Sequence, residues 1–185
     1  ELLEEIAQQI AGCKRCGLSS YRNNTVPGEG SPRAKVMFIG EAPGSDEDEM
    51  GRPFVGRAGQ LLRKLINHIG LEEGEYFIGN VLKCRPPGNR DPEQLEIEAC
   101  KPYLLAQTAV IKPGLLVTLG NFALQALLNP RYNISRVHGQ LLSRDGLNYL
   151  AAYHPAAILR GGARFKNDLV ADFEKIPIVL AELGQ

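Results

Sequence analysis

The sequence has no apolar run of membrane-spanning length, no net charge and no internal repeat. A helix that crosses a bilayer needs about 20 consecutive apolar residues, so an integral membrane protein is not expected. The first five residues, Glu-Leu-Leu-Glu-Glu, are acidic and lack the basic and apolar layout of a secretion signal. We therefore expect a cytoplasmic protein that has no membrane contact and keeps its thiols reduced.

The charge balance excludes one class of nucleic-acid binder. Lys and Arg together number 21, as do Asp and Glu, which argues against a protein that coats nucleic acid by electrostatics alone. The basic residues are unevenly spread, because residues 131–170 carry six basic side chains and two acidic ones. A local basic surface can hold phosphates without a basic total, although an ordinary solvated face shows the same pattern.

Strand and helix patterns alternate along the chain. Compact apolar runs predict strands at 35–39, 76–78, 115–119 and 147–153, the last paired with a short strand in 137–142. Helical spacing predicts helices at 2–10, 57–69, 92–111, 121–128 and 166–183, with Pro102 kinking or splitting the third. We expect one domain over residues 1–185: a three-layer α/β/α fold around a central, mostly parallel four-stranded sheet.

Polar clusters follow three of the predicted strands. They are Gly40-Glu41-Ala42-Pro43-Gly44, Gly79-Asn80 and His154-Pro155. Ligands of open parallel sheets bind beyond the carboxyl ends of the strands, so we expect these clusters to meet in one site. The acidic run 46–49 is expected to be a solvated loop.

Several side chains near this edge suit a ligand that has a planar, polar ring. The amide of Asn80 can accept and donate, so it can read an imide edge, although an isolated Asn is often a turn residue. Phe54 is placed to stack on a ring or to join the core. His154 can donate a hydrogen bond to a developing anion. The apolar run that ends in Ile158, Leu159 and Arg160 suits a wedge that enters DNA, or the first turn of a core helix.

The four cysteines are Cys13, Cys16, Cys84 and Cys100. Two thiols separated by two residues can bind one metal centre, and a distant pair completes four ligands. All-cysteine ligation suits zinc and an iron–sulfur cluster equally, so the spacing leaves both open. Disulfides are typical of secreted chains, which this sequence does not resemble, and four unrelated buried thiols are the other alternative. Either centre would join the amino-terminal segment at 13–16 to the 84–100 segment.

Taken together, these residues resemble the family 4 uracil-DNA glycosylases, the iron–sulfur branch of the uracil-DNA glycosylase superfamily. The resemblance covers Cys13 to about Arg164. It is carried by the ordered set of 40–44, Gly51-Arg52-Pro53-Phe54-Val55-Gly56, Gly79-Asn80, Lys83-Cys84-Arg85-Pro86, the four cysteines and His154-Pro155-Ala156.

The resemblance implies an enzyme that flips uracil, the product of cytosine deamination, out of single- or double-stranded DNA and hydrolyses its glycosidic bond to begin base excision repair. It implies a monomer in which the four cysteines hold a [4Fe–4S] cluster. The implied uracil pocket consists of Gly40, Glu41, Ala42, Gly44, Phe54, Asn80 and His154. His154 would stabilise charge on the uracil O2, and Ile158, Leu159 and Arg160, with Arg136 of the basic segment, would contact DNA.

The sequence departs from the best-known branch of the superfamily at one position. That branch has an Asp that positions the attacking water, and Ala42 stands here instead. We expect Glu41, with Asn89 of the Gly88-Asn89-Arg90 loop, to take over water activation. A related branch attaches covalently to uracil DNA through a His in an inserted loop before its last cysteine. The 15 residues between Cys84 and Cys100 contain no His, so we favour hydrolysis over a covalent or non-turning-over binder.

Two classes of protein outside this superfamily fit the sequence less well. A zinc-containing hydrolase of nucleotides or small phosphates would need a phosphate-binding loop, but the 40–44 turn has neither the Lys nor the Ser or Thr of such loops. A structural DNA-binding module would give Asn80 and His154 no reason to be polar.

Overall fold

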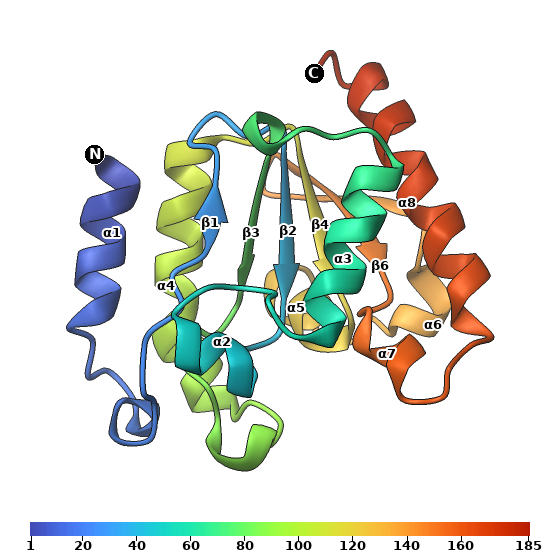
Figure 1. The fold of residues 1–185 in the computed structure, drawn as a ribbon. Helices are drawn as coiled ribbons and strands as arrows, with labels where there is room; N and C mark the ends of the chain where they lie inside the picture. The colour runs from blue at the N-terminus through green and yellow to red at the C-terminus, as the bar shows by residue number, and fades with distance from the viewer.

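The computed structural model describes residues 1–185, and its centre is a six-stranded sheet in the order β1-β3-β2-β4-β6-β5 (Figure 1). The strands are β1 (Glu29–Gly30), β2 (Val36–Gly40), β3 (Tyr76–Asn80), β4 (Leu115–Leu119), β5 (Leu141–Arg144) and β6 (Leu147–Ala152). The four inner strands run parallel, whereas β1 and β5 pair antiparallel at the two edges. The α/β class and the parallel centre are confirmed, but the expected count of four strands is wrong.

Helices connect and cover these strands. The α-helices are α1 (Leu2–Ala11), α2 (Ser45–Met50), α3 (Arg57–His68), α4 (Gln94–Ile111), α5 (Asn121–Leu127), α6 (Ile134–Val137), α7 (Ala156–Leu159) and α8 (Phe165–Glu182). Three short 3₁₀ turns are η1 (Gly17–Ser20), η2 (Glu73–Glu75) and η3 (Pro87–Asn89). No helix is both long and apolar enough to span a membrane.

The inner strands are apolar because both of their faces are covered. Every residue of β2 and β4 is buried, as expected for parallel strands between two helical layers. Figure 1 shows α3 in front of the sheet, where it contacts α8, and α5 behind the sheet, where it contacts β2 and β4. On the first face, Phe38 of β2 stacks on Phe173 of α8, with ring centroids 5.6 Å apart. One apolar core extends from Ile6 in α1 to Leu180 in α8.

Two local features of the structure differ from what the sequence indicates. Helix α4 is continuous through Pro102, so the expected split does not occur. The carbonyl that loses its partner belongs to exposed Glu98, where water can replace the missing bond. The edge strand β1 was not predicted, because two residues carry no periodicity; it forms where Gly30, with φ of +138°, lies against the backbone of Tyr76.

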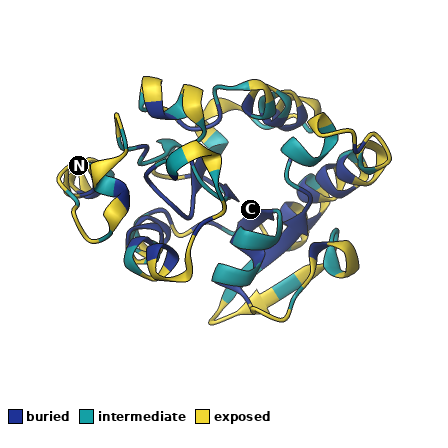
Figure 2. Ribbon diagram, turned by 90° about the horizontal axis from the view of Figure 1, so that it is seen from below, coloured by how far each residue is buried: buried dark blue, intermediate teal, exposed yellow.

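The carboxyl ends of the four parallel strands lie at one end of the sheet. In Figure 1 this is the lower end, where α2, α5 and α7 also lie. Figure 2 views the molecule from that end, with buried strands in the centre and exposed segments around them. The segments after β2, β3, β4 and β6 therefore share one region, as the strand alternation predicts.

Candidate active site

The site is centred on Gly40, the last residue of β2. A Cβ at this position would lie 2.6 Å from Oδ1 of Asn80, 2.6 Å from Cζ of Phe54 and 3.3 Å from Nε2 of His154. Three side chains from segments far apart in the sequence therefore surround the space that any larger residue would occupy. Gly40 is needed here for that space, since its φ is not positive.

Asn80 presents a free amide to this space. It is 2% exposed, yet its side chain makes no hydrogen bond to the protein. It lines a pocket of about 310 Å³ with Ala42, Phe54, Asn89 and His154. The protein makes no hydrogen bond to this amide and the residue lines the pocket, so its donors and acceptor are available to a polar ligand.

The Phe54 ring is fixed by its backbone. Phe54 has φ of +52°, and Arg63 of α3 donates to the Phe54 and Pro53 carbonyls, both at 3.0 Å. Gly59 allows this close approach, because a Cβ there would lie 2.0 Å from the carbonyl carbon of Phe54. The Phe54 ring stacks loosely on His154, with centroids 5.9 Å apart and planes 25° apart.

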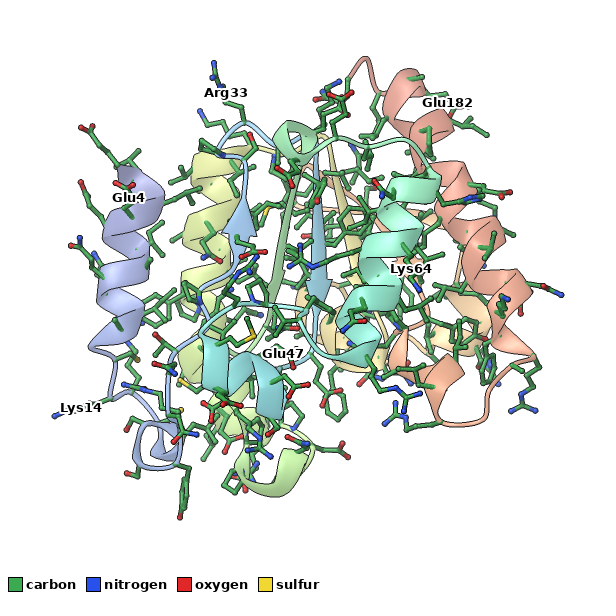
Figure 3. The ribbon with its side chains drawn as sticks, in the orientation of Figure 1. Glu4, Lys14, Arg33, Glu47, Lys64 and Glu182 are labelled. Carbon is green, nitrogen blue, oxygen red and sulfur yellow. The ribbon has the colours of Figure 1, made fainter.

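The acidic run after the first motif is structural, so the expectation of a solvated loop is wrong. It forms α2, and the Glu47 carboxylate accepts hydrogen bonds from the N–H groups of Gly44 (3.0 Å), Val55 (2.9 Å) and Gly56 (2.7 Å). Glu47 thus joins the loop after β2 to the loop that carries Phe54, and Figure 3 labels it near the carboxyl end of β2. Asp48, 1% exposed, accepts from Asn23.

His154 has a defined tautomer. The Ala156 N–H donates to Nδ1 at 3.1 Å, so in the neutral ring the proton is on Nε2, the atom that faces Gly40. Burial, with a smaller contribution from the positive charge of Arg160, lowers the pKa of His154 to about 4, although the negative charge of Glu47 opposes the shift. His154 is therefore a neutral donor at physiological pH.

Glu41 lies in a second pocket, of about 360 Å³, which shares Ala42 and His154 with the first. Burial raises the pKa of Glu41 to about 6; the negative charge of Asp91 adds to this effect and Arg160 opposes it. The Glu41 carbonyl also accepts from the Leu82 N–H at 3.0 Å, which extends the pairing beyond β2 and β3. A carboxylate with this pKa is suited to accept a proton near neutral pH.

The other expected pocket residues divide into two groups. Ala42 lines both pockets, and Asn89, with φ of +55°, lines the first while its Oδ1 accepts from Arg85 at 2.7 Å. Gly44 lines neither pocket and instead donates its N–H to Glu47. Asp91, which was not predicted from the sequence, faces Glu41 in the second pocket. Nothing in the spacing of Asp91 distinguishes it from a loop carboxylate.

The residues expected to contact DNA lie on short helices at the same end of the molecule. Ile158 packs partly on the core, Leu159 is 41% exposed, and Arg160 lines the second pocket. Arg136 is exposed on α6, two residues from Ile134, which lines that pocket, but does not line it itself.

The four cysteines line one cavity between α1, α4 and the loop after β3. N–H donors point at three of the sulfurs: Arg15 at Cys13 (3.5 Å), Arg22 at Cys84 (3.4 Å) and Lys83 at Cys100 (3.2 Å). Such donors favour thiolates, the form that binds metal.

The cysteine side chains themselves are set in an environment that disfavours free thiolates. Burial raises the pKa of Cys84, and it raises the pKa of Cys100 to about 11. No three His, Cys, Asp or Glu side chains converge on one point as the ligands of a single metal ion would. The four thiols nevertheless line one cavity, and this donor set suits a larger metal group that would deprotonate its own ligands.

Comparison with known proteins agrees with this geometry. Residues 27–175 match the family model described as the uracil DNA glycosylase superfamily. The chain is 45% identical to a type-4 uracil-DNA glycosylase of Sulfurisphaera tokodaii, over 94% of this chain and 83% of that protein. It is 44% identical to the type-4 protein of Archaeoglobus fulgidus (95% and 92%) and 38% identical to that of Thermotoga maritima (100% and 97%). The chain therefore belongs to the uracil-DNA glycosylase superfamily.

Proposed function

We propose that this protein is a uracil-DNA glycosylase that removes uracil from DNA by hydrolysis. The observation that carries the proposal is the unpartnered amide of Asn80, which shares a pocket of about 310 Å³ with Phe54 and His154. An imide has one N–H between two carbonyls, so the Asn80 amide can donate to O4 of uracil and accept from N3. Cytosine presents the opposite pattern at position 4 and would leave the amide badly paired.

The proposed chemistry needs no group beyond water and the site residues. The C1′–N1 bond breaks, its electron pair leaves with uracil, and positive charge develops on the sugar. The His154 Nε2–H donates to the O2 of the departing anion, and Phe54 stacks on the ring. Glu41 takes one proton from the water whose oxygen bonds to C1′. Asn89, which lines the neighbouring pocket with its Oδ1 bonded to Arg85, would assist through its free Nδ2 group.

The DNA interface and the metal centre complete the proposal. Leu159 and Arg160 would enter or hold the duplex from which the nucleotide has been flipped, supported by Ile158, while Arg136 would contact a phosphate. Cys13, Cys16, Cys84 and Cys100 would hold a [4Fe–4S] cluster, which would connect chain segments without a redox step.

We further propose that residues 1–185 act as one domain, because one core joins α1 to α8. The monomeric state that the resemblance implies is part of the same proposal. The cytoplasmic location expected from the sequence remains a prediction.

Uracil release from a defined oligonucleotide tests the function, with thymine and cytosine at the same position as controls. Asn80→Asp should lower the rate on uracil by about 100-fold or more, because a carboxylate repels O4. Asn67→Asp, at an exposed position on α3, is the matched control and should match wild type. If Asn80→Asp retains its uracil rate and gains none on cytosine, the base-reading assignment is wrong.

The same mixtures, run on a denaturing gel, separate hydrolysis from attachment. Free oligonucleotide with an abasic site is the expected product. A protein band shifted by bound DNA would contradict turnover and support covalent binding instead.

A further inference from the structure

Lys83 is a buried cation without an acidic partner. It is 1% exposed, and its Nζ donates to the neutral amide oxygen of Gln107 at 2.8 Å. The ion pairs of the chain do not include it. An interior ammonium group is costly unless an anion lies near it, and no Asp or Glu supplies that anion here.

The cysteine cavity is where the missing anion would lie. Lys83 lines this cavity beside all four cysteines, and its own backbone N–H donates to Cys100. Arg22 approaches from the other chain segment: its NH1 donates to the Cys84 sulfur at 3.4 Å and to the Cys13 carbonyl at 2.9 Å. Arg22 also has no carboxylate partner, so one cation in contact with a sulfur and one buried cation of a cavity-lining residue both lack an acidic counter-charge.

The charges of such a centre would balance. Four thiolates around a [4Fe–4S] core carry about two net negative charges, and Lys83 and Arg22 carry two positive ones. We propose that Lys83 and Arg22 are the counter-cations of the centre held by the cysteines, which they stabilise without ligating it. This inference rests on the cluster included in the proposed function.

Lys83 also connects the centre to the uracil pocket. Its Nζ lies 3.5 Å from the position of a Cβ on Gly79, the residue before Asn80. Two residues of the intervening segment pair with the end of β2 and the residue after it: the Val81 N–H donates to the Gly40 carbonyl and the Leu82 N–H to the Glu41 carbonyl, both at 3.0 Å. The charge pairing thus anchors the segment that presents Asn80.

The test replaces the charge with an uncharged chain of similar length, in holoprotein purified without oxygen. Lys83→Met should shift the reduction potential of the cluster to a more negative value, because a nearby positive charge favours the reduced form. Absorbance near 400 nm should be lost to an iron chelator about tenfold faster or more than in wild type.

Lys101→Met is the matched control. Lys101 follows Cys100 in the chain, but its Nζ donates to the Ala126 carbonyl at 3.1 Å and it does not line the cavity. This variant should keep the wild-type potential and chelator rate. A shift equal to that of Lys83→Met would mean that any lost positive charge suffices, and would overturn the inference.

Arg22→Met and Arg22→Lys give a second route should Lys83→Met fail to fold. Arg22→Met should make the reduction potential more negative and speed the loss of the cluster to the chelator, as Lys83→Met does, and Arg22→Lys should restore most of the wild-type values. If Lys83→Met and Arg22→Met both keep the wild-type potential and chelator rate, this inference is overturned while the proposed glycosylase function is untouched. Wild type without iron would remove the cluster and this inference together, while uracil release, measured separately, reports on the glycosylase activity.

Discussion

The ionisation of Glu41 should set the acid side of the pH–rate profile. Burial and Asp91 raise its pKa to about 6, whereas the pKa of His154 is lowered to about 4 and lies below this range. If the base is the carboxylate, the active fraction is about 9% at pH 5 and about 91% at pH 7. Single-turnover uracil release should therefore be about tenfold faster at pH 7 than at pH 5.

Glu41→Gln tests the assignment, because an amide does not titrate. The variant should be slow and its rate should be flat between pH 5 and pH 8. Glu5→Gln, on the exposed face of α1, should keep the wild-type profile. If Glu41→Gln retains the same acid limb, another group is responsible and the role of Glu41 as the base is refuted.

The same pKa shift has an opposite effect on stability. The unfolded carboxyl ionises near its ordinary value of 4.5 and the folded one near 6, so between these values the folded chain binds more protons. The contribution of Glu41 to stability is present below pH 4.5 and is lost as the pH rises to about 6. Glu41→Gln should therefore stabilise the fold at pH 7, by about 1 kcal/mol after allowing for its partial exposure. Urea unfolding at pH 4 and pH 7 measures this difference.

Three further substitutions test the shape of the site. Gly40→Ala should abolish uracil release and lower the free energy of unfolding, since its Cβ would lie 2.6 Å from both Asn80 and Phe54 and would displace them. Gly74→Ala, with nothing within 4 Å, should be neutral in the same assay. Glu47→Gln removes the charged acceptor of three backbone N–H groups, so it should lower the free energy of unfolding by about 1–3 kcal/mol, as measured by urea unfolding. In steady-state kinetics it should raise KM more than it lowers kcat. Leu159→Ala should slow release from double-stranded DNA and spare single-stranded DNA, compared in parallel reactions, because only a duplex needs a wedge.

The sequence predicted those parts of the fold that depend on local periodicity. The inner strands and the long helices follow from apolar spacing, and their order places Gly40, Asn80 and His154 at one edge. The β1 edge strand and the continuity of α4 depend on long-range pairing and on solvent access to one carbonyl. Neither leaves a periodic signal in the sequence.

The positioning groups were missed for a related reason. Glu47 stands in a run of acids that looks solvated, and only the fold brings the N–H groups of Val55 and Gly56 to its carboxylate. One local signal could have identified it: Gly44 followed three residues later by Glu47 is the spacing at which an acid caps the start of a helix. Asp91 carries no comparable signal, because its effect on Glu41 arises from proximity across two loops.

Glu41 and His154 are shifted in opposite directions by one cause. Burial raises the pKa of the Glu41 carboxyl and lowers the pKa of the His154 imidazole, so both shifts favour the uncharged form of the side chain. A site that disfavours charge on its own side chains concentrates its electrostatic response on charge that develops in the substrate. For the proposed reaction those charges are a uracil anion at the Nε2–H of His154 and a sugar cation on the side of Glu41. The same burial that makes Glu41 costly to ionise also weakens the screening of its charge. The ionised carboxylate therefore acts more strongly on the sugar cation than it would in water.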